Sequence, residues 1–153
     1  MKPRTRARGI ALQALFEIDL VNHPPGDVLK HRLEESTLDE RLSEFVRQIV
    51  TGVWPICQRL DQFIAEHAPE WPLAQVATID RNILRIALWE FAVQGDTPLK
   101  VVINEAVELA KTFGSDSSPR FINGVLGSLA TQQNVIQQSL SIKSSQDTDN
   151  EEK

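Results

Sequence analysis

Four basic residues open the chain before any acid occurs. They are Lys2, Arg4, Arg6 and Arg8, and the first acid is Glu17. The whole chain has 16 Lys and Arg against 21 Asp and Glu, so the part beyond residue 16 keeps 12 bases and a net charge of −9. Guanidinium and ammonium groups bind phosphate oxygens, and the acidic remainder would restrict a polyanion to this end. The pattern indicates a phosphate-binding site, with solubilising charge on a frayed terminus as the alternative.

Residues that could catalyse a reaction or bind a metal do not gather in the sequence. Glu105 and Glu108 lie one turn apart on an expected helix, where we predict a solvated face and not an acid–base pair. Phosphate-cradling motifs such as G-x-x-x-x-G-K-[ST] are missing. The histidines and the single cysteine show no metal-ligand spacing: His23, His31, His67 and Cys57. We therefore expect a binding protein that is no enzyme and has no catalytic residue, cofactor or metal.

The composition suits one globular domain. A chain of 153 residues with 41% apolar residues can bury a core of useful size. No apolar run approaches the roughly 20 residues that span a bilayer, so we expect no membrane association. A single Cys57 excludes an internal disulfide and is typical of a reducing cytoplasm, where we place the protein.

The elements that must position the basic residues are all predicted to be helices, because apolar residues recur at helical spacing and strand-like alternation is absent. The basic residues fall in the first turns of the first helix, where free N–H groups also favour anions. Thr37 with Glu40 predicts a capping box, and Thr97 and Ser118 predict N-caps before prolines. Gly52 and Pro55 should kink or split one helix. The expected helices cover 3–21, a short stretch from about 27, 37–68, another short stretch opened by Pro72, 77–94, 98–113 and 118 to about 133.

The first helix has apolar residues on two sides. One side carries Ala7, Ile10, Ala11, Ala14, Leu15 and Ile18. The opposite side carries Leu12, Phe16 and Leu20, at a spacing of one turn. The second stripe needs either another layer of helices within the domain or a partner protein.

Several stretches in consistent order resemble the NusB family of bacterial transcription antitermination factors. They are "RTRARGIALQALF", "DRNILRIALWEF", "TPLKVVINEAVELAKTFG" and "SSPRFINGVLGSL", which span about residues 4–129. The resemblance implies an all-α fold of two small helical bundles packed across each other, with about seven helices. We expect this domain to cover residues 1–133, and we predict that the polar, acidic residues 134–153 form a disordered tail.

The resemblance also implies a function. It points to a factor that binds single-stranded boxA RNA of rRNA leader transcripts together with the tenth small-subunit ribosomal protein, NusE. Other Nus factors and RNA polymerase would join this complex, which promotes read-through in rRNA operons. The residues expected to bind RNA are Lys2, Arg4, Arg6, Arg8, Lys111, Arg120 and Phe121. Those expected to bind the partner protein are Leu12, Phe16 and Asp80.

Two alternatives stay open. A homodimer could cover the RNA surface, and a similar domain is fused to some rRNA cytosine methyltransferases, to which this chain would deliver RNA. The sequence departs from the family pattern at Thr5, which interrupts the arginines, and at Gly9, where an acid is common. Phe16 stands where tyrosine is common and lacks its hydroxyl. For Phe121, core packing is an equal alternative to stacking on RNA.

Overall fold

The computed structural model describes residues 2–71 and 75–140, and these residues form helices and connecting turns without a strand. The expected all-α fold with about seven helices is confirmed. The α-helices are α1 (Pro3–Val21), α2 (Pro25–Glu35), α3 (Glu40–Val53), α4 (Cys57–His67), α5 (Thr78–Leu88), α6 (Leu99–Phe113) and α7 (Ser118–Ala130). A 3-10 turn, η1 (Trp54–Ile56), follows α3, and a π-helical segment, η3 (Trp89–Gln94), continues α5.

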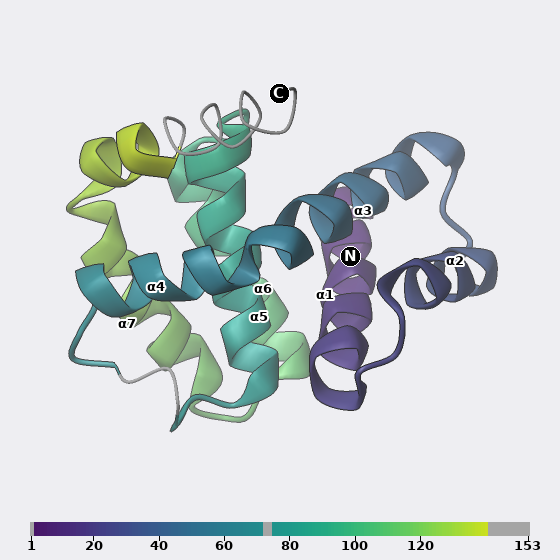
Figure 1. The fold of residues 1–153 in the computed structure, drawn as a ribbon, viewed down its shortest axis with the longest axis horizontal. Coiled ribbons are helices and arrows are strands. Elements are labelled where there is room, and N and C mark those ends of the chain that lie inside the picture. Colours follow the sequence, from purple (N-terminus) through teal and green to yellow (C-terminus); the bar gives the residue numbers. More distant parts are fainter. Residues whose placement is uncertain (1, 72–74, 141–153) are drawn as a thin grey trace, which may run out of the picture.

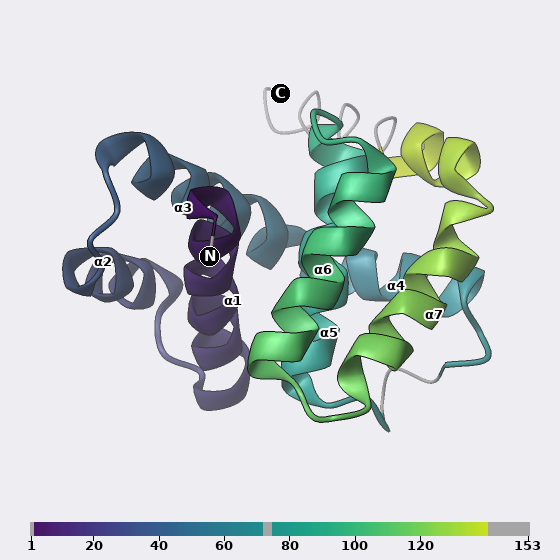
Figure 2. The same cartoon turned by 180° about the vertical axis from the view of Figure 1, so that it is seen from behind.

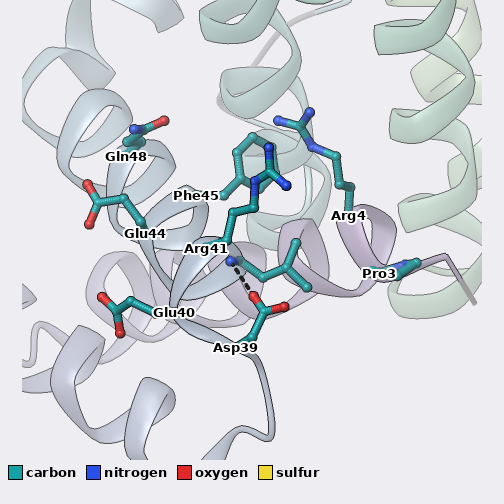
Figure 3. A pocket seen from close by; sticks show the side chains of 9 residues that line it. Pro3, Arg4, Asp39, Glu40, Arg41, Glu44, Phe45 and Gln48 are labelled. Carbon is teal, nitrogen blue, oxygen red and sulfur yellow. Dashed lines mark hydrogen bonds between the residues drawn. The ribbon is translucent and has the colours of Figure 1, made fainter.

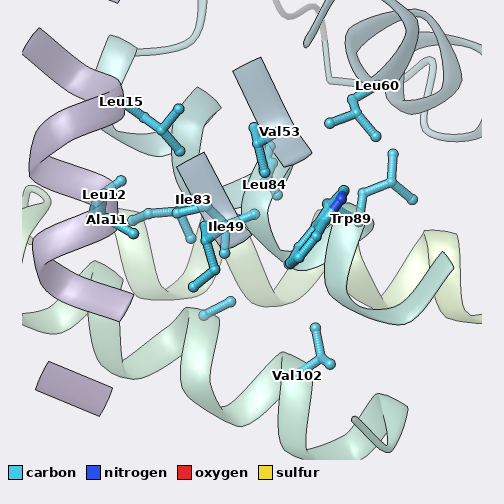
Figure 4. Close-up of a cluster of buried hydrophobic side chains, with 14 of the residues drawn as sticks. Ala11, Leu12, Leu15, Ile49, Val53, Leu60, Ile83, Leu84, Trp89 and Val102 are labelled. Carbon is cyan, nitrogen blue, oxygen red and sulfur yellow. The ribbon is translucent and has the colours of Figure 1, made fainter. Parts of the chain in front are cut away.

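The helices form two groups that meet along α1 (Figures 1 and 2). Helices α1, α2 and α3 pack on one another, and α4 to α7 form the second group around α5. Helix α1 also packs against α5 and α6, which joins the groups. Buried side chains from both groups fill one continuous core (Figure 4), so the two expected bundles share their interior.

Helix α1 is buried on both of its apolar sides. Ala7, Ala11 and Ala14 have no exposed surface, and their small side chains let neighbouring helices approach closely. Leu12, from the opposite stripe, is also fully buried. That stripe emerges only toward the end of the helix, where Phe16 is half-buried and Leu20 is 55% exposed. The domain itself therefore covers most of the second stripe.

Gly52 allows α3 and the second group to meet. A Cβ atom at this position would lie 2.5 Å from the indole ring of Trp89, which is too close for any side chain. Two residues after α3 ends, Pro55 lies in η1, as expected from its missing N–H group. The long apolar helix predicted for 77–94 is confirmed, but its last turn is π-helical and ends at Gly95, whose φ of 77° favours glycine.

The predicted N-caps are wrong by one or two residues. Helix α3 begins at Glu40, and its cap is Asp39, whose carboxylate accepts a hydrogen bond from the Leu42 N–H at 2.9 Å. The Thr37 hydroxyl instead accepts a hydrogen bond from Arg6. Similarly, Pro98 and not Thr97 occupies the N-cap position of α6, and Ser117 occupies that of α7, without a side-chain capping hydrogen bond at either. Tertiary hydrogen bonds take up side chains that the local pattern assigns to caps.

Helical structure continues beyond residue 133, where we expect the domain to end. Residues 133–140 are helical, and Ile136 and Leu140 have no exposed surface. The Gln137 amide donates to the Phe91 carbonyl at 2.8 Å, which fixes this helix on the end of η3. These two buried apolar residues, one turn apart, supply the packing. The rest of the expected tail, 141–153, lies outside the described residues, as does the short helix expected to begin at Pro72.

An ion-pair network joins the two helix groups away from the basic end. Asp19 of α1 accepts hydrogen bonds from Arg81 at 2.9 Å and from Arg85 at 3.0 Å, both on α5. Arg85 also binds Asp61 of α4 through two hydrogen bonds. Burial alone would raise the pKa of Asp19, but the hydrogen bond from Arg81 and the charge of Arg85 lower it below its usual value. The Asp19 carboxylate therefore stays charged and joins α1 to α5. Arg85 extends this network to Asp61 on α4.

Two glycine-to-alanine substitutions should change stability in opposite directions. Gly52→Ala should lower the free energy of unfolding by about 1–3 kcal/mol, because its methyl group collides with the Trp89 ring. Gly127→Ala, in α7, meets nothing within 4 Å and should raise it by about 0.5–1 kcal/mol through helix propensity. Urea denaturation of both variants measures the difference. Equal shifts would show that Gly52 is not a packing requirement.

Candidate nucleic-acid interface

The start of α1 presents three of the predicted bases to solvent. Lys2 is the N-cap, Pro3 is at the first helical position, and no side chain caps the helix. Lys2, Arg4 and Arg6 are exposed on these first two turns. The free backbone N–H groups and the helix dipole add to their positive charge. Arg6 is partly restrained by its hydrogen bond to the Thr37 hydroxyl. This end of the helix is a suitable site for phosphate oxygens.

Arg8 differs from its three neighbours because it lies inside the protein. Its exposed fraction is 4%, and its Nε and Nη2 atoms bind the Glu90 carboxylate at 2.9–3.1 Å. Glu90, on η3, is itself only 1% exposed. Glu105 lies 3.6 Å from Arg8 and accepts a hydrogen bond from the Thr5 hydroxyl at 2.8 Å. The prediction that Arg8 binds RNA is corrected: this arginine neutralises a buried acid. Glu105, expected on a solvated face, takes part in the same network.

The ring of Phe45, on α3, carries two of the arginines. The guanidinium of Arg4 lies 4.2 Å from the ring centroid and that of Arg8 lies 5.2 Å from it. Such contacts are cation–π interactions, and arginine forms them readily. Phe45 is 6% exposed and forms part of the wall of an open hollow of about 850 Å³ between α1 and α3. Figure 3 shows Arg4 and Arg41 extending beside this ring from the two helices.

Helix α6 lies beside α1 and carries Lys111 in its last turn. The two helices run side by side (Figure 2), with Thr5 bound to Glu105 and Gly9 facing the Phe113 ring. A Cβ atom at Gly9 would lie 3.1 Å from that ring, so a side chain at this position requires the ring to move by a few tenths of an ångström. Lys111 is exposed and forms a 3.2 Å ion pair with Glu108 of the preceding turn. Both of these side chains are solvated, so the pair is weak.

The positions predicted on α7 lie at another part of the surface. Arg120 is exposed and Phe121 is half-buried, with its ring packed against the core. The hydroxyl of Ser118, two residues before Arg120, donates to Asp80 at 3.0 Å in the first turn of α5. That turn is next to the residues that bind Asp19, in the last part of α1. The bases thus form one group around the start of α1 and a second near the start of α7.

Two of the predicted partner-binding residues are buried. Leu12 has no exposed surface, so the prediction that it contacts a partner is corrected to a core position. Asp80 is 7% exposed, and burial raises its pKa while the hydrogen bond from Ser118 lowers it. It holds α5 and α7 together and is corrected to a structural role. Phe16 is half-buried, and its exposed neighbours are Leu20 and Val21, at 55% and 49%.

Sequence reasoning missed Phe45 and Arg41. Phe45 lies in α3, and its pairing with Arg4 depends on the tertiary contact between α1 and α3, which no local sequence pattern predicts. Arg41 lies among Asp39, Glu40 and Glu44, so the local charge pattern conceals it. Across residues 2–71 and 75–140, no group of three or more acidic, histidine or cysteine side chains is placed to hold a metal ion. None of the helices in this part is long and apolar enough to cross a membrane.

Comparison with known proteins points to one family. The NusB family profile matches residues 5–131. The transcription antitermination protein NusB of Roseiflexus castenholzii is 50% identical over 131 residues, which cover 84% of this chain and 92% of the relative. The NusB structure of T. maritima has a TM-score of 0.77 and 32% identity, over 86% of this chain and 92% of that one. A chain in a crystal structure of antitermination factors NusB and NusE with double-stranded RNA shares the fold, with a TM-score of 0.78 and 24% identity over 86% and 98%.

Removing Arg8 should destabilise the fold far more than removing Arg4. Arg8→Ala leaves the buried Glu90 charge unpaired, which should cost about 3–5 kcal/mol of unfolding free energy. Arg4→Ala loses an exposed cation–π contact worth about 0.5–1 kcal/mol. Replacing both buried charges, as Arg8→Met with Glu90→Leu, should recover most of the loss. Chemical denaturation compares the variants, and equal costs for Arg4→Ala and Arg8→Ala would contradict the assignment.

Proposed function

The chain belongs to the NusB family, and we propose on that basis that it is a cytoplasmic transcription antitermination factor which binds boxA RNA together with NusE. Other Nus factors and RNA polymerase complete the assembly, which reads through terminators in rRNA operons. The protein acts by binding and has no catalytic role. The chain covers 92% of a relative named as an antitermination protein, which supports this function over that of a methyltransferase-associated domain.

The observation that carries the RNA proposal is the exposed group of Lys2, Arg4 and Arg6 at an uncapped helix start. These charges contact solvent, whereas the equally basic Arg8 is already bound to Glu90. Lys111 extends the basic surface along α6. Arg120 and Phe121 would contact a further part of the same RNA, with Phe121 supplying the half-buried edge of its ring. When a single strand binds these groups, Lys and Arg side chains replace the counterions on its phosphates, and the release of those counterions favours binding.

The proposed protein partner docks on the end of α1, where Phe16, Leu20 and Val21 leave apolar surface uncovered. Leu12 supports this surface from below without reaching it. A protein of this fold has been crystallised with NusE and double-stranded RNA, so these two classes of partner are the first to test. A second copy of this chain on the same surface is the competing possibility, and size-exclusion chromatography distinguishes it.

RNA binding should lose salt dependence when the exposed bases are removed. For single strands the slope of log K against log salt is about −0.7 for each phosphate neutralised. The slope for the double variant, Lys2→Ala with Arg6→Ala, should therefore be shallower by about 1.4. Lys30→Ala, which removes an exposed base from α2, is the control and should leave the slope unchanged. The measurement is fluorescence anisotropy with boxA RNA and NusE at several salt concentrations. An unchanged slope in the double variant would make these residues solubilising charge only.

Phe16→Asp should abolish pairing with NusE without unfolding the protein, because Phe16 is half-buried and lies beside the exposed Leu20. Val135→Asp places the same charge on another exposed apolar residue, 55% accessible, and should leave pairing intact. Isothermal titration calorimetry measures the pairing, and circular dichroism checks the fold. Normal binding by a folded Phe16→Asp variant would exclude this surface as the NusE site.

A further inference from the structure

The hollow between α1 and α3 lies directly beside the exposed bases of α1 and is not accounted for by any predicted site. Arg4 contributes to both, because it is an exposed base of α1 and also lines the hollow. On the α3 side the hollow is lined by Arg41, Phe45 and Gln48, together with three acids. The volume of about 850 Å³ is large enough for a nucleotide and is open to solvent.

The charges of the hollow are not equally available to a ligand. Glu40 and Glu44 are both paired with Arg47, at 3.0 and 3.1 Å. Asp39 is occupied as the N-cap of α3. In the described part of the chain, neither Arg4 nor Arg41 has a carboxylate within 4.0 Å. Three acids and two arginines line the hollow, and Glu40 and Glu44 share one partner, Arg47. The two arginines have no acidic partner among the described residues, so Arg4 and Arg41 are the groups of the hollow that are available to an anionic ligand.

The Phe45 ring gives Arg4 a defined orientation. The guanidinium carbon of Arg4 lies over the ring, 4.2 Å from its centroid, and Arg4 is exposed to solvent. A guanidinium held in this way presents its other face for stacking, and arginine stacks on nucleobases. The Phe45 ring also lies 5.2 Å from the guanidinium carbon of Arg8, which Glu90 holds in place. A chain of buried contacts thus supports the one arginine that lies between the helix end and the hollow.

We propose that bound RNA continues from the start of α1 into this hollow, where Arg41 binds a phosphate and Arg4 stacks a base opposite Phe45. This inference rests on the RNA binding proposed above and adds Arg41, Phe45 and the exposed Gln48 to the RNA surface. A single strand is the ligand that fits, because it supplies a flat base and a phosphate on neighbouring atoms of one chain.

The test removes one charge from the hollow and adds another. Arg41→Ala should make the salt slope shallower by about 0.7 and weaken binding about five-fold at 0.1 M salt, whereas Lys30→Ala should change neither. Gln48→Arg should make the slope steeper by about 0.7, while Gln58→Arg, on the exposed side of α4, should not. A gain in affinity cannot arise from misfolding. Arg4→Lys keeps the charge and should lower affinity about ten-fold at an unchanged slope, because stacking is lost.

Three results would overturn the inference. In the first, Arg41→Ala binds RNA with the same affinity and salt slope as Lys30→Ala, and Gln48→Arg with those of Gln58→Arg. If the double variant Lys2→Ala with Arg6→Ala still has a shallower salt slope, RNA contacts α1 but not the hollow, and the proposed function stands. If Arg41→Ala weakens NusE pairing without RNA and leaves the RNA slope unchanged, the hollow is a protein contact. If the wild-type protein with NusE binds no RNA, both the inference and the proposed function are excluded.

Discussion

The buried pair of Arg8 and Glu90 connects the basic end of this protein to its core. It bridges α1 and the π-helical end of the second helix group, where both residues are almost fully inaccessible. Neither charge is tolerated there alone, so the pair requires α1 to lie against η3 in one register. The Arg8 guanidinium also lies 5.2 Å from the centroid of the Phe45 ring, and the same ring contacts the guanidinium of Arg4. The position of the exposed arginines therefore depends on an interaction that no ligand reaches.

The structure divides the four N-terminal bases into two kinds. Lys2, Arg4 and Arg6 are exposed and available to a ligand. Arg8 is buried and stabilises the fold through its ion pair with Glu90. The hollow beside them extends this division, because its acids are satisfied within the protein while its arginines are not. An acidic protein can in this way present a local cationic surface. A ligand there interacts with the exposed bases that have no acidic partner, whatever the net charge of the whole chain.

Much of the fold could be predicted from the sequence because helical periodicity and glycine or proline breaks are local signals. The spans of α1, α6 and the long helix ending at Gly95 were predicted in this way. Arg4 and Arg8 could not be told apart, because they are one turn apart on one helix and the acid that buries Arg8 is 82 residues away. The caps failed for a related reason, since Thr37 and Ser118 hydrogen-bond across helices. Ile136 and Leu140 fall in the expected tail because so few apolar residues in a polar stretch are not enough to show helical periodicity.

The close approach of Gly9 to Phe113 has a consequence for how this family can vary. Where α1 and α6 touch, a methyl group on residue 9 would lie 3.1 Å from the Phe113 ring, so a side chain at residue 9 needs the ring to move aside. A larger residue at 9 is compatible with this packing only when residue 113 is smaller or turned outward. The two positions should therefore substitute in a correlated way among relatives, and a lineage that changed only one of them would have to shift α6 and, with it, Lys111.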